Sequence, residues 1–389
     1  MTMELPAIAR IAAALVAALL ISFIATPVVK SIAQMVGAVD VPKDNRRMHN
    51  HPIPRMGGLA IFLGFLLSTL IFVPMSSSMR GMLLGGVIIV ILGIFDDIYA
   101  LPALPKLLVQ IAAALVAVLH GNVIQVLSNP NIFSENPYWT LGSLAVPLSV
   151  IWIVAITNAV NLIDGLDGLA VGVATISSLT MLVIAMLVSE NVVALMMAAL
   201  AGGCIGFMPY NLNPAKIFMG DTGSTFLGFV LATVSIQGLF KFYTIISFAV
   251  PFLMLGLPLF DTCFAILRRL AKGQSPMAPD RSHVHHRLID MGFNQKQAVA
   301  ILYVISAILG LSAVVLTTSG ALKAMVLLCA LCLAGLISGK IFLSHNENHQ
   351  EKTKEKESND HAIESHDDLR DPPGGGEDGP SGKGTGEQG

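Results

Sequence analysis

Oxygen-bearing side chains recur at every third residue in the stretch "NAVNLIDGLDGLA", which covers residues 158–170. The four are Asn158, Asn161, Asp164 and Asp167. A continuing helix would align them in one slowly rotating stripe, whereas Gly165 and Gly168 are equally compatible with a loop or a broken helix. Such donors suit Mg²⁺, which takes one or two protein carboxylates and completes its shell with phosphate and water. The pattern of an EF-hand calcium loop is missing, and a purely structural turn is the alternative.

A pair of adjacent carboxylates, Asp96 and Asp97, ends the aliphatic run "VIIVILGIFDD", and Lys106 follows ten residues after Asp96. Adjacent carboxylates repel each other unless a cation compensates their charge. We therefore interpret this group as catalytic residues that hold a divalent cation and a phosphate. The alternative is an ordinary pair of charges at a helix end.

The stretch "FMGDTGSTFLG" places Asp221 between glycines at the start of an apolar run. In one interpretation Asp221 is a helix N-cap. In the other, the free amides of a helix N-terminus bind a phosphate, and Asp221 binds the metal that bridges to that phosphate. The presence of the other polar clusters favours the second interpretation.

Histidine and arginine alternate in "DRSHVHHRL". The residues that could act on a substrate are Arg281, His283, His285 and His286. A zinc site would need further Cys or His ligands, which the neighbouring sequence lacks. Arginine can bind a diphosphate through paired hydrogen bonds, and histidine can donate a hydrogen bond or a proton. A solvated charged loop is the remaining alternative.

The elements that position these residues are predicted to be membrane helices. Hydrophobic residues make up 54% of the 389-residue chain, charged residues only 12%, and the mean hydropathy is +0.73. These values identify an integral membrane protein rather than a soluble domain. About eleven apolar runs are long enough to span a bilayer, so we expect an all-α polytopic bundle. Their centres lie near Ala14, Phe65, Val87, Ala114, Val150, Thr180, Ala198, Val230, Met254, Ala307 and Leu331.

The distribution of Lys and Arg predicts the orientation of the chain. If the loops alternate, one side receives almost all the basic residues and the other only Arg80, Lys241 and Lys323. The positive-inside rule then places the N-terminus outside and the polar clusters on the cytoplasmic face. We assign residues 1–343 to the transmembrane domain and residues 344–389, which are polar and glycine-rich, to a disordered cytoplasmic tail.

A first polar loop falls on the same predicted face. Its candidate residues are Asp40, Lys43, Arg46, His49, Arg55, Gly57 and Gly58. They either line the site or anchor the chain through the positive-inside effect. A transporter would more often place polar residues at mid-membrane within broken helices, and we identify no charged residue deep in an apolar run. No basic block suggests binding to nucleic acid.

Together the motifs resemble those of the polyprenyl-phosphate N-acetylhexosamine-1-phosphate transferases. The resemblance covers about residues 40–287 and rests on "DDIYALPALPK", "NAVNLIDGLDGLA", "FMGDTGS", "PLFDTCFAILRR" and "DRSHVHHRL". The interrupted "HVHH" resembles the branch that uses UDP-N-acetylglucosamine to start teichoic acid, O-antigen or similar polymers. The alternative is the peptidoglycan branch, which transfers phospho-MurNAc-pentapeptide. A CDP-alcohol phosphatidyltransferase is a poorer match, because "DGLDGLAVGV" lacks an arginine.

The resemblance implies transfer of N-acetylglucosamine-1-phosphate from UDP-N-acetylglucosamine to undecaprenyl phosphate, with release of UMP, at a bacterial plasma membrane. It implies Mg²⁺ as the cofactor, with Mn²⁺ as a substitute. Direct displacement, a covalent aspartyl intermediate, and a monomeric or homodimeric enzyme all stay open.

The resemblance also implies roles for individual residues. The metal would rest on Asp221 and Asn161 with Asp96 or Asp97 nearby, and Asp96 would meet the attacking lipid phosphate. The remaining assignments are Lys106 for a phosphate; Asp167 and Phe218 for the uracil; Arg281, His283, His285 and His286 for the diphosphate or sugar; Arg55 and Asn158 for substrate; and Asp164 for the site without a defined task.

Overall fold

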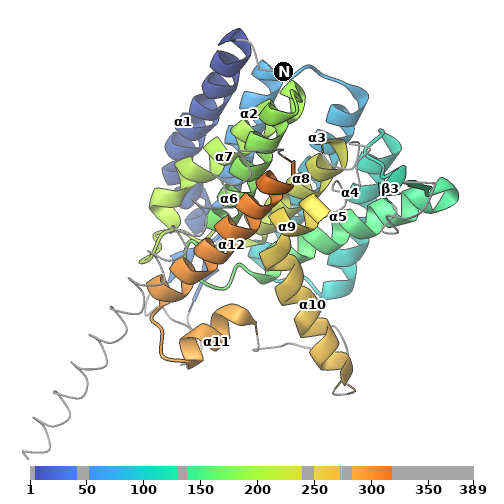
Figure 1. The fold of residues 1–389 in the computed structure, drawn as a ribbon. Coiled ribbons are helices and arrows are strands. Elements are labelled where there is room, and N and C mark those ends of the chain that lie inside the picture. The colour runs from blue at the N-terminus through green and yellow to red at the C-terminus, as the bar shows by residue number, and fades with distance from the viewer. Residues whose placement is uncertain are drawn as a thin grey trace, which may run out of the picture. The chain divides into compact units, whose positions relative to one another are not determined.

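The computed structural model describes residues 5–41, 52–128, 138–238, 249–271, 273 and 283–317. Within these ranges the chain forms twelve α-helices and two small antiparallel sheets (Figure 1). The predicted tail and the apolar run near Leu331 lie outside the described residues, so both stay predictions.

The bounds of the elements follow the chain order. The helices are α1 (Leu5–Met35), α2 (Gly58–Phe72), α3 (Ser77–Tyr99), α4 (Ala103–Leu119), α5 (Ala145–Leu162), α6 (Leu169–Leu187), α7 (Asn191–Asn211), α8 (Gly220–Gly238), α9 (Ala249–Met254), α10 (Gly256–Ala271), α11 (Val284–Asp290) and α12 (Gln295–Thr317). A 3₁₀ helix, η1 (Gly142–Leu144), precedes α5. Strand β1 (Val39–Asp40) pairs with β2 (Ile53–Pro54), and β3 (Val126–Ser128) pairs with β4 (Tyr138–Thr140).

The predicted all-α multi-pass architecture is confirmed. Six described helices are long and apolar enough to cross a membrane, namely α1, α3, α5 with the preceding η1, α6, α7 and α12. Helices α2 and α4 are shorter and apolar. Ten of the predicted run centres fall within described helices. The run near Met254 is divided, because a turn at Leu255 separates α9 from α10.

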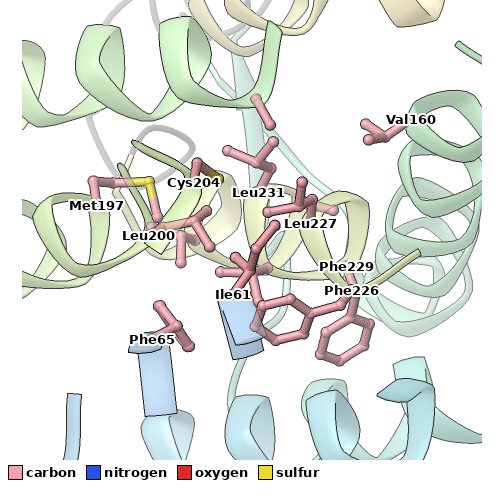
Figure 2. Close-up of a cluster of buried hydrophobic side chains, with 14 of the residues drawn as sticks. Ile61, Phe65, Val160, Met197, Leu200, Cys204, Phe226, Leu227, Phe229 and Leu231 are labelled. Atoms are coloured by element: carbon pink, nitrogen blue, oxygen red, sulfur yellow. The ribbon is translucent and has the colours of Figure 1, made fainter. Parts of the chain in front are cut away.

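Helix α8 lies at the centre of the bundle and packs against α3, α5 and α2 (Figure 1). Every residue from Thr222 to Ile236 is buried. Four of its hydroxyl groups, those of Ser224, Thr225, Thr233 and Ser235, donate to carbonyl groups of the same helix, as Thr233 does to Phe229 O at 2.8 Å. The Thr222 hydroxyl donates to Asp97 Oδ2 instead, so all five are hydrogen-bonded in the apolar interior. Figure 2 shows Phe226 of α8 among side chains of neighbouring helices, including Phe65 and Ile61 of α2.

The N-terminal turn of α8 lies in backbone contact with two other helices. A Cβ atom added to Gly58 of α2 would lie only 1.9 Å from Gly223 Cα, and one added to Gly93 of α3 would lie 2.3 Å from Thr222 Cα. Both positions therefore require glycine for close approach rather than for chain flexibility. These contacts fix where the first turn of α8 sits.

We predict that Gly93→Ala lowers the thermal stability of the detergent-solubilised protein, because the new methyl group would push the first turn of α8 away from α3. Gly86→Ala on the same helix is the matched control, since its Cβ would meet Phe226 at an ordinary 3.6 Å. The loss at Gly93 should be about 1–3 kcal/mol or more. Equal melting temperatures for the two variants would contradict the proposed close packing.

Candidate active site

Asp97 of α3 caps the N-terminus of α8. Its Oδ1 accepts a hydrogen bond from the Asp221 backbone N–H at 2.9 Å. Its Oδ2 accepts from the Thr222 N–H at 3.1 Å and from the Thr222 hydroxyl at 2.6 Å. Gly220 has φ +73°, and a Cβ there would lie 2.4 Å from Asp97 Oδ2. The cap expected from Asp221 itself is thus supplied by another helix.

Lys106 bridges two carboxylates that come from different helices. Its Nζ donates to Asp96 Oδ2 at 2.8 Å and to Asp221 Oδ2 at 3.2 Å. Asp96 Oδ1 accepts from the backbone N–H of Leu101 at 2.7 Å, so both oxygens of Asp96 are engaged. The Asp96 side chain is only 7% exposed, whereas Asp221 and Lys106 are 31% and 28% exposed. We call the group of Asp96, Lys106 and Asp221 the carboxylate centre. Its members that a ligand can reach are Asp221 and Lys106.

The C-terminus of α5 completes the carboxylate centre. Asn161 donates from Nδ2 to the Ser224 hydroxyl at 2.8 Å, and its side chain also interacts with the Asp221 carboxylate. Asn158 bonds instead to Gln110 Oε1 of α4 at 2.6 Å. Since α5 ends at Leu162, the two asparagines lie on the helix and the two aspartates in the following loop. The sequence alone was compatible with either a helix or a loop for this stretch.

Asp164 lies partly buried in the loop between α5 and α6. Burial, together with the nearby Asp221 and Asp97 carboxylates, raises the pKa of Asp164 to about 8. A buried carboxyl group with further carboxylates beside it is a place where a cation would be stabilised.

Asp167 connects the same loop to the segment before α8. Its Oδ2 accepts from Asn213 Nδ2 at 2.9 Å and from the Ala215 N–H at 3.1 Å. Asn213 in turn donates to Gln295 of α12 at 2.7 Å, and the Tyr303 hydroxyl donates to the Gly168 carbonyl at 2.5 Å. Helix α12 therefore helps to hold this loop in place.

The segment with Phe218 pairs with the first polar loop. The Phe218 N–H donates to Pro54 O at 2.8 Å, and its carbonyl accepts from the Gly57 N–H at 2.9 Å. The Arg55 guanidinium nitrogen Nη2 lies 3.6 Å from Asp40 Oδ1. The structure thus brings this part of the loop beside the start of α8. Other predicted residues of the loop, Lys43, Arg46 and His49, lie outside the described residues.

The three histidines form a stack at α11. The rings of His283 and His285 are parallel, with centroids 5.8 Å apart, and His286 lies 4.3 Å from His285. A Cβ on Gly165 would lie 2.3 Å from His285 Nε2, so this ring touches the loop that carries Asp164. Burial, together with the charges of His286 and His283, lowers the pKa of His285 to about 4. His285 is therefore neutral at pH 7. Arg281 lies outside the described residues.

Sequence reasoning overlooked Asp261. It lies within α10 in the quoted motif "PLFDTCFAILRR", but no role was assigned to it. Its Oδ2 lies 2.9 Å from His283 Nδ1, and the aspartate is 3% exposed. Helix α10 is not among the described helices that are long and apolar enough to cross a membrane, so Asp261 does not test the expectation that no charged residue lies deep in an apolar run. A single carboxylate within an apolar segment was the signal that could have revealed it.

The carboxylate centre has the donor chemistry of a Mg²⁺ site. Within the described part of the chain, no three or more His, Cys, Asp or Glu side chains are grouped as a candidate metal site. Mg²⁺ bound together with a phosphorylated substrate needs fewer, because one or two carboxylates suffice when phosphate and water complete its shell. Asp221 is the accessible carboxylate, and Asp96 and the Asn161 amide adjoin it.

Comparisons with known proteins identify the family of the chain. The family model described as glycosyl transferase family 4 matches residues 79–239. A probable undecaprenyl-phosphate N-acetylglucosaminyl 1-phosphate transferase of Bacillus subtilis is 43% identical over 80% of this chain and 86% of its own length. A decaprenyl-phosphate N-acetylglucosaminephosphotransferase of Mycobacterium tuberculosis is 35% identical over 74% and 77%. A phospho-N-acetylmuramoyl-pentapeptide-transferase of Staphylococcus aureus is 29% identical over 76% and 95%.

We predict that Asp164→Asn stabilises the protein in EDTA at pH 8. The raised pKa of Asp164 means that the folded state holds a proton that the unfolded state releases above about pH 4. Stability is therefore lost as the pH rises from about 4 to about 8, and the asparagine variant avoids this loss.

Melting temperatures measured across this pH range test the prediction. The variant should melt several degrees above the wild type at pH 8, and the difference should shrink toward pH 4. Glu190→Gln, an exposed position at the opposite end of α6, is the control and should show no such trend. A difference that grows toward low pH would contradict the assignment.

Proposed function

Because the chain belongs to glycosyl transferase family 4, we propose that it transfers N-acetylglucosamine-1-phosphate from UDP-N-acetylglucosamine to undecaprenyl phosphate or a similar polyprenyl phosphate. The observation that carries this proposal is the bridge from Lys106 to Asp96 and Asp221, where the ends of α3, α4, α5 and α8 meet. The names of the Bacillus subtilis and Mycobacterium tuberculosis relatives support the same reaction.

The proposed reaction is a displacement at phosphorus. An oxygen of the lipid phosphate forms a bond to the phosphorus that carries the sugar, and the bond from that phosphorus to the bridging oxygen breaks. UMP leaves with the electron pair, and the sugar stays attached to the lipid through a diphosphate. Since both reactants are anions, catalysis consists mostly of positioning and charge neutralisation. Lys106, with three donors on a point charge, is suited to a phosphate oxygen.

We assign a Mg²⁺ ion to Asp221, with Asn161 and Asp96 beside it. Mn²⁺ is the expected substitute. When bound, the cation would neutralise the diphosphate and polarise the phosphoryl group under attack. The accessible Asp221 carboxylate and the burial and neighbouring carboxylates that raise the pKa of Asp164 support this assignment.

The contacts divide the adjacent aspartates between two roles. Asp97 has both oxygens occupied by the first turn of α8, so we assign it to positioning Asp221 rather than to chemistry. We assign Asp96 to the attacking lipid phosphate, which it would meet through Lys106. Because both oxygens of Asp96 are also hydrogen-bonded, and because a phosphate monoester is largely ionised at pH 7, we favour direct displacement over a covalent aspartyl intermediate.

The loops around the carboxylate centre supply the groups for substrate recognition. We assign Asp167 and Phe218 to the uracil, and the histidine stack with Arg281 to the diphosphate and sugar. Arg55 and Asn158 are assigned to substrate, and Asp164 to the surroundings of the cation without an individual task. Arg55 and Phe218 lie in segments paired through Pro54 and Gly57, which supports a shared binding surface.

The placement of the site at helix ends favours an enzyme that works at the membrane surface over a transporter. The positive-inside distribution of Lys and Arg supports a cytoplasmic site in a bacterial plasma membrane, with the N-terminus outside. The product would be a lipid-linked sugar, which a glycosyltransferase acting on lipid carriers must extend into a polymer.

The direct test is to incubate purified protein with labelled UDP-N-acetylglucosamine, Mg²⁺ and undecaprenyl phosphate, followed by extraction into butanol. We expect label in the lipid phase and an equal amount of UMP. Asp221→Asn should reduce turnover by at least about 100-fold at every Mg²⁺ concentration, because the cation loses its charged ligand. Glu190→Gln, far from the carboxylate centre, should retain wild-type turnover.

Three outcomes would change the proposal. Absence of label in the lipid phase would remove the transferase function. Labelling only from UDP-MurNAc-pentapeptide would assign the chain to the activity of its Staphylococcus aureus relative. Wild-type turnover by Asp221→Asn would remove Asp221 from the metal site.

A further inference from the structure

A buried aspartate in α10 reaches the histidine stack from outside the motif that contains the histidines. Asp261 Oδ2 lies 2.9 Å from His283 Nδ1, and Oδ1 accepts from the Val284 N–H at 2.9 Å. The exposed fractions of Asp261 and His283 are only 3% and 5%. Both carboxylate oxygens are therefore occupied by the start of α11, which lies at one end of the bundle (Figure 1).

Helix stability does not explain a carboxylate at this position. The neighbours Leu257 and Ala265 on the same face of α10 are buried and apolar, while Phe260 and Phe264 are exposed on other faces. An apolar residue at 261 would complete the buried face without the cost of dehydrating a charge. Buried ion pairs often add no net stability over apolar packing. The pair is therefore better explained by what it does to His283.

A carboxylate at Nδ1 determines which ring nitrogen of His283 carries a proton. Because a carboxylate only accepts hydrogen bonds, Nδ1 must be the protonated nitrogen, and Nε2 remains available for another partner. The same bond fixes the angle of the ring. Carboxylates orient catalytic and metal-binding histidines in this way in many enzymes.

The fixed ring is connected to the carboxylate side of the site. His283 stacks parallel to His285 at 5.8 Å with an angle of 4° between the rings. His285 in turn touches Gly165, which follows Asp164 directly in the loop after α5. Asp261 is thus linked, through contacts of the His283 and His285 rings, to the loop beside the carboxylate centre.

We propose that Asp261 is a positioning residue that holds His283 with Nδ1 protonated, so that Nε2 is presented to the diphosphate of the sugar nucleotide. This inference rests on the proposed function and adds to it a residue from α10. The competing explanation is that Asp261 only caps the first turn of α11 through the Val284 N–H.

Asp261→Asn distinguishes the two explanations. The amide oxygen can still accept from the Val284 N–H, but the amide nitrogen must donate to His283 Nδ1, which moves the ring proton to Nε2. We expect kcat to fall by about 10–100-fold, with KM for UDP-N-acetylglucosamine and the melting temperature little changed. Thr262→Val is the matched control, because the buried Thr262 hydroxyl on the next residue of α10 has no hydrogen-bond partner among the described residues.

A double-mutant cycle tests whether Asp261 acts through His283. In a His283→Ala background, Asp261→Asn should cause no further loss of kcat, because the ring that it orients is gone. Equal losses in the two backgrounds would overturn the proposal, and so would a kcat for Asp261→Asn within about twofold of wild type. Activity of the wild-type protein in the same assay tests the proposed function separately.

The tautomer can also be measured without turnover. Nitrogen-15 spectra of protein labelled at the histidine rings should show His283 protonated at Nδ1 in the wild type and at Nε2 in Asp261→Asn. Assignment uses the signal that disappears in His283→Ala. Wild-type His283 with an unprotonated Nδ1 would overturn the inference even if the protein proves to have another activity.

Discussion

The capping of α8 by Asp97 is the interaction on which the site depends. The first amides of a helix have no partner within the helix, and in a membrane protein an unsatisfied amide is costly. The Asp97 carboxylate of α3 accepts hydrogen bonds from two of these amides and from the Thr222 hydroxyl. Because Gly58 and Gly93 allow backbone contact at the same turn, the position of Asp221 is fixed from two sides. The reactive carboxylate is held by groups that do no chemistry.

Around that fixed turn, the charges that neutralise each other come from different helices and not from a single helix. Lys106 lies between Asp96 and Asp221, and Asn161 supplies an amide from α5. Burial and the neighbouring Asp221 and Asp97 carboxylates raise the pKa of Asp164 to about 8. A site with this surplus of negative charge is prepared for a cation, and a cation is what two phosphorylated substrates need in order to approach each other.

The sequence predicted which residues lie near the carboxylate centre but not the separate contacts that each of them makes. The all-α membrane architecture followed from hydropathy, and the grouping of Lys106 with Asp96 and Asp97 followed from their spacing. Adjacent residues on a helix point about 100° apart, so the separate contacts of Asp96 and Asp97 depend on how α3 packs against α8. The partnership of Asp261 with His283 spans 22 residues and two helices, and no local pattern reports such a contact.

A structure of the protein with bound UDP-N-acetylglucosamine and Mg²⁺, determined by cryo-electron microscopy in lipid nanodiscs, tests the central claim most directly. We expect a cation at about 2.1 Å from an oxygen of Asp221, with the diphosphate in contact with both the cation and Lys106, and with Asp97 still bonded to the first turn of α8. A diphosphate bound away from Lys106, or a cation held by Asp97 in place of Asp221, would contradict the account.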